Sequence, residues 1–171
     1  MIVKRKVCLL GATGVGKTSL VTRYVRSVFS ESYRTTIGVA IETRRVPYGA
    51  DAVDLVIWDL SGEDEFQSVQ FTYLKGAAGY LLVVDGTRRA TLETAERLRA
   101  GATRVLGNAP LVVVANKCDL DDRWDLDDRA LEPFTSRGWP VIRTSAATGE
   151  GVVKAFDVLV AAMMHDAQIH P

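Results

Sequence analysis

The amino-acid sequence predicts a three-layer α/β fold, in which a six-stranded, mostly parallel sheet carries about five helices on its two faces. Apolar runs of strand length alternate along the chain with segments whose apolar residues recur at helical spacing. This alternation is typical of parallel sheets with crossover helices. One pair of alternating segments joined by a short turn adds a single antiparallel strand near an edge of the sheet.

The first half of the chain begins with a strand, a loop and a helix. Residues 7–10 are an apolar run that predicts a buried strand. Helical spacing then relates Leu20, Val21, Tyr24, Val25 and Val28. Residues 29–38 lose this periodicity and predict a loop. Two alternating segments, residues 39–44 and 53–57, flank a turn at residues 47–51 and predict a hairpin.

The second half continues the alternation of strands and helices. Residues 79–85 and 111–115 are apolar without alternation, as expected for strands that are covered on both faces. Helices are predicted at residues 91–106, 126–137 and 152–164, and a short strand at residues 140–143. Polar motifs follow the predicted strands, and the carboxyl ends of strands are where open α/β sheets bind ligands.

Length and charge limit the classes of protein that the chain can represent. Its 171 residues correspond to one domain over residues 1–171. Lys plus Arg and Asp plus Glu each number 21, which argues against nucleic acid or an anionic membrane as a partner. Cys8 and Cys118 lie in or beside apolar runs, where free reduced thiols are expected. With no signal peptide and no run of about 18 apolar residues, we expect a cytoplasmic monomer.

The most informative motif is Gly-Ala-Thr-Gly-Val-Gly-Lys-Thr at residues 11–18, which matches the phosphate-binding loop G-x-x-x-x-G-K-[ST]. Glycines allow backbone N–H groups to turn toward a phosphate, and the following helix adds its positive dipole end. Lys17 brings a charge to the outer phosphates, and the Thr18 hydroxyl is placed to bind Mg²⁺. The alternative, a plain strand-to-helix turn, does not explain the Lys-Thr pair. The predicted nucleotide contacts here are Gly11, Thr13, Gly14, Val15, Gly16, Lys17, Thr18 and Ser19.

Two further motifs suit the metal and the terminal phosphate. Asp59 follows a predicted strand and suits a carboxylate that holds Mg²⁺ through water, while the N–H of Gly62 suits a terminal phosphate. Thr36 lies in the loop after the first helix, where its hydroxyl would complete the shell of the metal. The motif at Asp59 is a weak signal when it is taken alone. The alternative for Thr36 is an ordinary loop threonine.

The last two motifs concern the base. The sequence Asn-Lys-Cys-Asp at residues 116–119 ends a predicted strand, and the Asp119 carboxylate can accept from both the ring N–H and the exocyclic amine of guanine. Adenine offers no such pair of donors, which argues against an ATP-dependent kinase. The sequence Thr-Ser-Ala at residues 144–146 ends the last strand, where backbone N–H groups can approach the base carbonyl. Its alternative is a plain polar loop.

Together, in this order and spacing, the five motifs resemble those of the Ras superfamily of small GTPases over nearly the whole chain. The Rab-type branch is the most similar, because the segments at residues 36–39, 58–59, 73–77 and 79–85 follow its pattern. The resemblance implies a P-loop NTPase fold, GTP or GDP with Mg²⁺, slow hydrolysis, and switch loops at about residues 30–38 and 60–74. It also implies an exchange factor, a GTPase-activating protein and effectors that bind through about residues 30–45 and 60–76.

The resemblance also assigns individual roles. Phe29 would pack on the guanine, Lys117 would lie along it, Tyr33 would cover the phosphates, and Thr36 and Gly62 would sense the terminal phosphate. Ser145, Ala146 and Ala147 would complete the base pocket. Magnesium ligands would be Thr18, Thr36 and, through water, Asp59. Catalysis would involve Lys17, Thr36 and Glu63.

Three departures from the family pattern bear on function. Glu63 stands where the family has the glutamine that orients the attacking water, so a module that binds nucleotide constitutively, with little or no hydrolysis, is the alternative to a switch. Ala147 replaces a lysine that often flanks the base. The last fifty residues contain no cysteine, so no lipid anchor is expected.

Overall fold

The computed structural model describes residues 1–30, 36–64 and 69–169. The strands are β1 (Ile2–Gly11), β2 (Val39–Tyr48), β3 (Asp51–Leu60), β4 (Gly79–Asp85), β5 (Leu111–Asn116) and β6 (Val141–Arg143). The helices are α1 (Lys17–Arg26), α2 (Thr91–Leu106), α3 (Asp128–Thr135) and α4 (Val152–Ile169). Short 3₁₀ turns are η1 (Phe71–Leu74) and η2 (Asp121–Arg123).

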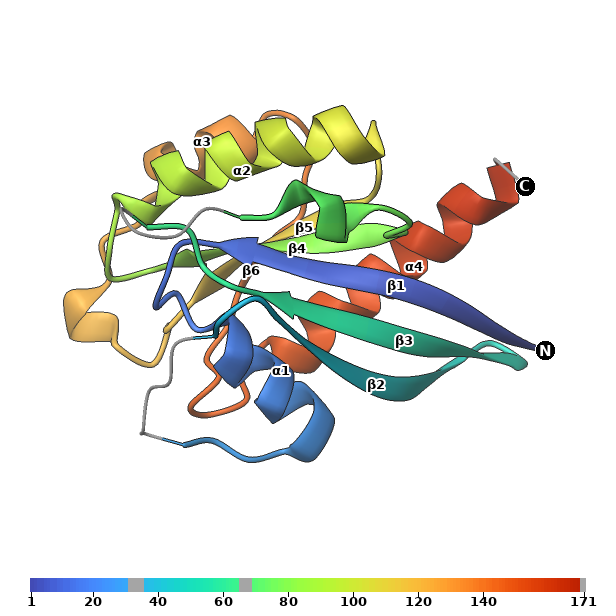
Figure 1. The fold of residues 1–171 in the computed structure, drawn as a ribbon. Helices are drawn as coiled ribbons and strands as arrows, with labels where there is room; N and C mark the ends of the chain where they lie inside the picture. Colours follow the sequence, from blue (N-terminus) through green and yellow to red (C-terminus); the bar gives the residue numbers. More distant parts are fainter. Residues whose placement is uncertain (31–35, 65–68, 170–171) are drawn as a thin grey trace.

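The predicted sheet is confirmed. The strands lie in one six-stranded sheet in the order β2-β3-β1-β4-β5-β6. The edge strand β2 pairs antiparallel with β3, and the other neighbouring strands pair in parallel. The carboxyl ends of the parallel strands therefore meet at one edge of the sheet, where the loops that follow them lie near one another (Figure 1).

Helices cover both faces of the sheet, which gives the three layers (Figure 1). One apolar cluster joins α1 and α4 to one face, and a second cluster joins α2 and α3 to the other. Successive residues of β1 alternate between the clusters, with Leu9 in the first and Leu10 in the second. Every residue of β4 and β5 is buried, which explains why these two segments are apolar without alternation.

Several element boundaries differ from those predicted. The described residues form four α-helices and two 3₁₀ turns, where about five helices were expected. Helix α1 ends at Arg26 because Ser27 adopts a left-handed conformation (φ 55°). Val28, predicted on the apolar face of that helix, is consequently 52% exposed. Helix α3 begins only after Asp127, whose side chain caps it by accepting from the Ala130 N–H.

Other boundaries extend beyond the predicted ones. Strands β2 and β3 pair as far as Tyr48 and Asp51, so their turn is tighter than residues 47–51. Helix α4 continues to Ile169, past the predicted end at residue 164. Among the described residues, no helix is long and apolar enough to cross a membrane.

Candidate nucleotide-binding site

A continuous cleft lies at the carboxyl edge of the sheet. One part, of about 380 Å³, is lined by the phosphate loop, the start of α1, Phe29, Thr36 and Gly62. A second part, of about 370 Å³, is lined by Asn116, Lys117, Asp119, Ala146 and Ala147. Both parts share Gly14, Gly16, Ser19, Phe29 and Ser30. All five motifs thus contribute residues to the walls of one cleft.

The phosphate loop has a backbone that only glycine suits at two positions. Gly14 and Gly16 have φ angles of 79° and 102°, in the left-handed region that L-residues rarely occupy. A Cβ atom on Gly16 would lie 2.4 Å from Asn116 Nδ2. Since Asn116 is itself hydrogen-bonded to the Val15 carbonyl at 2.9 Å, it cannot move away without loosening the loop.

Lys17 begins α1 and is only 6% exposed. Its Nζ donates to the carbonyls of Gly11 at 3.0 Å and Ala12 at 3.2 Å, which hold the ammonium over the loop. Burial lowers the pKa of Lys17 from 10.5 to about 8, against the opposing effect of the Asp59 carboxylate. A buried cation of this kind is stabilised by an anionic ligand.

We expect the affinity for GDP to fall as pH rises above 8, to about one tenth of its pH 7 value at pH 9. Phosphates beside Lys17 raise its pKa again, so binding at high pH takes up a proton. For folding of the free protein, the pH dependence has the opposite sign. Between pH 8 and 10.5 the Lys17 amine binds more protons in the unfolded chain than in the folded protein. The contribution of Lys17 to folding stability therefore increases with pH in this range. Calorimetric titration with GDP at several pH values measures the effect. In Lys17→Gln the dependence should vanish, and persistence there would contradict the assignment.

The predicted metal ligands lie together beside the phosphate loop. The Thr18 hydroxyl donates to Asp59 Oδ2 at 2.5 Å, and the Thr18 and Thr36 hydroxyl oxygens are 2.6 Å apart. Asp59 is 2% exposed, and within the described part of the chain its Oδ1 has no hydrogen-bond partner. Burial raises the pKa of Asp59, although Thr18, Lys17 and Thr36 oppose the rise. Two hydroxyls and an orphaned carboxylate oxygen fit a hard cation such as Mg²⁺.

The base end of the cleft is held by a side-chain network. Asn116 donates to the Val15 carbonyl and accepts from Thr144 Oγ1 at 3.0 Å and the Ala146 N–H at 3.3 Å. It therefore ties the phosphate loop to the loop after β6. Asp119 accepts from the buried Ser145 hydroxyl at 2.7 Å, which orients its carboxylate.

Asp119 is exposed in the protein alone. Ala147, which lines the same part of the cleft, has only a methyl side chain. Arg23 holds the loop that contains Ala147, because it donates to the carbonyls of Ala146 at 2.8 Å and Ala147 at 2.6 Å.

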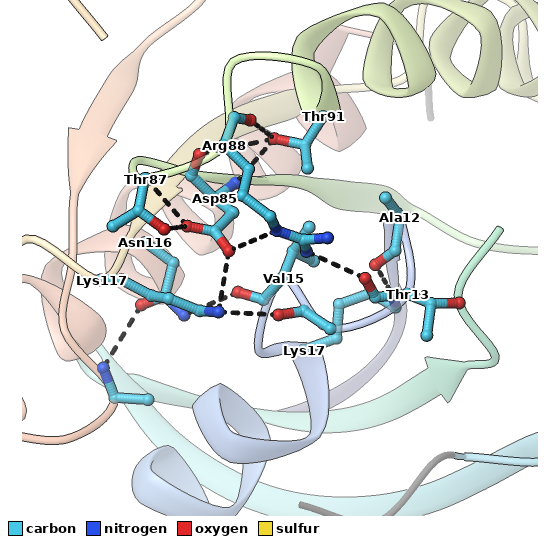
Figure 2. A network of polar contacts seen from close by, with 12 residues as sticks. Ala12, Thr13, Val15, Lys17, Asp85, Thr87, Arg88, Thr91, Asn116 and Lys117 are labelled. Atoms are coloured by element: carbon cyan, nitrogen blue, oxygen red, sulfur yellow. Dashed lines mark hydrogen bonds and ion pairs between the residues drawn. The ribbon is translucent and has the colours of Figure 1, made fainter. Parts of the chain in front are cut away.

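Lys117 is held in place by contacts on the phosphate loop. Its backbone adopts φ 72°, which is uncommon for a residue with a side chain. Its Nζ donates to the Gly14 carbonyl at 2.9 Å and pairs with Asp85 at 2.8 Å (Figure 2). This side chain thus lines the base part of the cleft and contacts the phosphate loop.

Glu63 is attached to the phosphate loop by its backbone and to α2 by its side chain. Its N–H donates to the Gly11 carbonyl at 3.2 Å, and its carbonyl accepts from the Thr13 N–H at 3.0 Å. The carboxylate pairs with Arg97 at 2.7 Å. A Cβ atom on Gly62 would lie 2.4 Å from Thr13 Cα, so the close approach requires glycine. Glu63 consequently lies beside the cleft rather than in its lining.

The structure brings together most of the predicted site. Residues that line the cleft directly are Thr13, Gly14, Gly16, Lys17, Thr18, Ser19, Phe29, Thr36, Gly62, Asn116, Lys117, Asp119, Ala146 and Ala147. Gly11, Val15, Asp59, Glu63 and Ser145 lie behind or beside that lining. Tyr33 lies outside the described residues.

Sequence reasoning missed Arg23, Asp85, Arg88 and Arg97. The three arginines are long side chains on helix or loop surfaces, and their spacing shows no motif. Asp85 did carry a signal, because a carboxylate that ends a fully apolar strand is costly to bury without partners.

Comparisons with known proteins agree with this geometry. A family model described as the Ras family matches residues 6–165. The chain is 35% identical to the Ras-related protein YPTC6 of Chlamydomonas reinhardtii over 162 residues, which cover 94% of this chain and 75% of that protein. It is 36% identical to the Ras-related protein Rab-25 of Homo sapiens over 157 residues, or 91% and 74% of the two chains. For the Ras-related protein Rab-7b of Bos taurus, the identity is 36% over 161 residues, or 90% and 79%. The chain therefore belongs to the Ras family and is Rab-like.

Proposed function

We propose that this small GTPase is a guanine-nucleotide switch that hydrolyses GTP slowly. The observation that carries the proposal is the placement of Asp119, oriented by Ser145, at one end of a cleft whose other end is the phosphate loop. A carboxylate that faces the donors of guanine selects the base, and the loop binds the phosphates. Base and phosphate recognition are thus joined in one site.

Each group at the phosphate end has a distinct task in this proposal. Lys17 neutralises charge on the outer phosphates. Thr18 and Thr36 supply hydroxyl oxygens to Mg²⁺, and Asp59 holds its water shell. When bound, Mg²⁺ neutralises charge that develops on the transferring phosphoryl oxygens. Gly62 offers its N–H to the terminal phosphate.

Two loops are proposed to respond to the terminal phosphate. Thr36 already contacts Thr18 at 2.6 Å, and the Ser61 N–H donates to the Gly38 carbonyl at 2.9 Å, so the two loops are linked to each other and to the site. Regulators and effectors would read this state through about residues 30–45 and 60–76. Ile37 and Ile41, which are 88% and 51% exposed, supply apolar surface there.

The alternative is a module that binds nucleotide constitutively with little hydrolysis. The observation that motivates it is the position of Glu63, whose carboxylate pairs with Arg97 and is not part of the cleft lining. The two functions predict the same binding and differ only in turnover. A cytoplasmic monomer remains part of the proposal in either case.

Single-turnover release of phosphate separates the two functions. The protein is loaded with GTP, free nucleotide is removed, and phosphate is measured over time, while competition with ATP measures base selectivity. Release within a single turnover supports the switch, and tight binding without release supports the module. Binding of ATP as strong as that of GTP would refute both.

We expect Thr18→Ala to release GDP several-fold faster than wild type at millimolar Mg²⁺, because a direct metal ligand is lost. Chelation by EDTA should accelerate release from wild type and have little further effect on Thr18→Ala. Release of a fluorescent GDP analogue measures both rates. Thr103→Ala, a change in a hydroxyl that bonds the Arg99 carbonyl on α2, is the matched control. An equal response of Thr18→Ala and wild type to EDTA would contradict the metal assignment.

A further inference from the structure

Asp85 ends β4 and is a buried carboxylate to which the nucleotide site described above gives no role. Its side chain is 1% exposed. Oδ1 accepts from the Thr87 N–H at 2.9 Å and the Thr87 hydroxyl at 2.7 Å. Oδ2 receives two cations, Arg88 Nε at 2.9 Å and Lys117 Nζ at 2.8 Å (Figure 2). Each carboxylate oxygen of Asp85 thus has two donors.

The two cations each use a further donor on the phosphate loop. Arg88 Nη2 donates to the Thr13 carbonyl at 3.0 Å. Lys117 Nζ donates to the Gly14 carbonyl at 2.9 Å. Asn116 Nδ2 donates to the next carbonyl, that of Val15, at 2.9 Å. Three successive carbonyls of the loop are therefore held from the side of β4 and β5 (Figure 2).

The orientation of these carbonyls determines the orientation of the N–H groups that follow them. In a planar trans peptide the C=O of one residue and the N–H of the next point in opposite directions. Holding the carbonyls of Thr13 and Gly14 therefore directs the N–H groups of Gly14 and Val15 the other way, toward the cleft that Gly14 lines. The Val15 N–H makes a long contact of 3.4 Å with the Ala12 carbonyl.

Asp85 is what keeps the two cations in place. Arg88 and Lys117 are 48% and 31% exposed, and without a fixed anion such side chains would turn to solvent. Burial of Asp85 opposes its ionisation, but hydrogen bonds from Lys117, Thr87 and Arg88 outweigh burial and lower its pKa. Charge-assisted hydrogen bonds to a desolvated carboxylate are stronger and more geometrically defined than exposed ones.

Hydrogen bonds with Thr91 fix the loop that carries Arg88. The Asp85 N–H donates to Thr91 Oγ1 at 3.0 Å, and the Thr91 hydroxyl donates to the Arg88 carbonyl at 2.8 Å. The backbone of Arg88 is thereby fixed relative to β4 and α2. Its guanidinium can then bridge Asp85 and Thr13 through two different nitrogens.

We propose that Asp85 and Arg88 are positioning residues for phosphate recognition: Asp85 fixes Arg88 and Lys117 on the Thr13 and Gly14 carbonyls, and so directs the following amides toward the phosphates. The inference rests on the proposed function for the identity of the nucleotide, but its geometry applies to any polyphosphate in the loop. A pre-oriented loop spends less free energy on ordering when the ligand binds.

The test uses the full chain with two probes, a fluorescent GDP analogue and inorganic pyrophosphate. We expect Asp85→Asn to release the GDP analogue about 10-fold faster than wild type and to bind pyrophosphate more weakly, because the neutral amide no longer holds two cations. Asp54→Asn, which removes the carboxylate of an ion pair with Arg45 on the hairpin, is the matched control and should match wild type.

Variants of Arg88 separate positioning from simple charge neutralisation. Lysine at this position keeps a cation beside Asp85, but its single nitrogen does not reproduce the arginine's two-nitrogen bridge to Asp85 and Thr13. We therefore expect Arg88→Lys to release GDP nearly as fast as Arg88→Gln, and the Asp85→Asn/Arg88→Gln double variant to be no faster than Asp85→Asn alone. Wild-type release from Arg88→Lys, or additive effects in the double variant, would overturn the role of Arg88.

The outcomes for Asp85 distinguish the inference from the proposed function. Tight GDP binding by wild type with unchanged release from Asp85→Asn overturns the inference and leaves the function standing. Absent GDP binding, with pyrophosphate binding that weakens in Asp85→Asn, overturns the function and supports the inference. If the wild-type protein binds neither GDP nor pyrophosphate, the inference and the proposed function are both overturned.

Discussion

Asp119→Asn is expected to lower the affinity for GTP by ~10⁴-fold, the largest effect of any single substitution that we predict. In the proposed function the carboxylate accepts two hydrogen bonds from guanine, whereas an amide would present a donor toward one of those guanine donors. Two donors then face each other without an acceptor. The cost is a lost charge-assisted pair and an unsatisfied group, which together account for a discrimination of this size.

The same variant should gain affinity for xanthosine triphosphate. Xanthine presents a carbonyl where guanine has its exocyclic amine, so the new amide meets an acceptor. Competition titrations with GTP, xanthosine triphosphate and ATP measure all three affinities. The matched control is Asp122→Asn, a loss of charge in the exposed turn that follows Asp119, which should leave selectivity unchanged. Equal GTP affinity in Asp119→Asn and wild type would show that Asp119 does not bind the base.

The contact between Asp119 and Ser145 shows which part of the affinity the substitution affects. The carboxylate is oriented by the Ser145 hydroxyl at 2.7 Å. Asparagine offers Ser145 a carbonyl acceptor as well, so the substitution preserves that contact and changes mainly the face presented to the base. The loss of affinity is therefore assigned to recognition of the base.

The sequence predicted best those features that depend on local chemistry and on periodicity. The local structure of the phosphate loop is such a case, because its glycines, Lys17 and Thr18 all lie within one strand–loop–helix unit. The unalternating segments at residues 79–85 and 111–115 are another, since strands that are covered on both faces have no polar side. Strand β4 was predicted at its observed bounds, Gly79–Asp85.

Predictions failed where a backbone conformation or a long side chain decided the outcome. Val28 continues the apolar spacing of α1, but the left-handed Ser27 ends the helix before it. Arg23 and Arg88 reach loop carbonyls 123 and 75 residues away along the chain. Apolar periodicity locates the helix or loop of such an arginine, whereas its rotamer and its distant partner depend on the assembled fold.

The position of Glu63 was predicted from a local motif, whereas its pairing with Arg97 depends on the assembled fold. Its substitution has the second-largest effect on function that we predict. We expect Glu63→Ala to lower the single-turnover rate of GTP hydrolysis by about 10- to 100-fold, at or below the lower end of the ~10²–10⁴-fold range for one acid–base group. A glutamate can accept a proton from the attacking water, which a glutamine cannot do. Its charge opposes its approach to an anionic phosphate. The affinity for GDP should remain nearly unchanged, because the Glu63 side chain does not line the cleft.

Arg97 provides the control for this prediction, because it pairs with Glu63 at 2.7 Å and is 60% exposed. An exposed ion pair contributes up to about 1 kcal/mol. Release of Glu63 from this pair in Arg97→Ala should therefore raise the hydrolysis rate by at most about fivefold. In the Glu63→Ala/Arg97→Ala double variant, this gain should disappear.

The four rates together decide what Glu63 does. A slow Glu63→Ala, a faster Arg97→Ala and a double variant as slow as Glu63→Ala mean that Glu63 acts on the water and that Arg97 competes for it. If Arg97→Ala were instead slower than wild type, the guanidinium would be required to neutralise Glu63 near the phosphate. Wild-type hydrolysis by Glu63→Ala would make the carboxylate a bystander. The backbone of residue 63, which is bonded to Gly11 and Thr13, would then be its sole contribution, as expected for a module that binds nucleotide without using Glu63 for turnover.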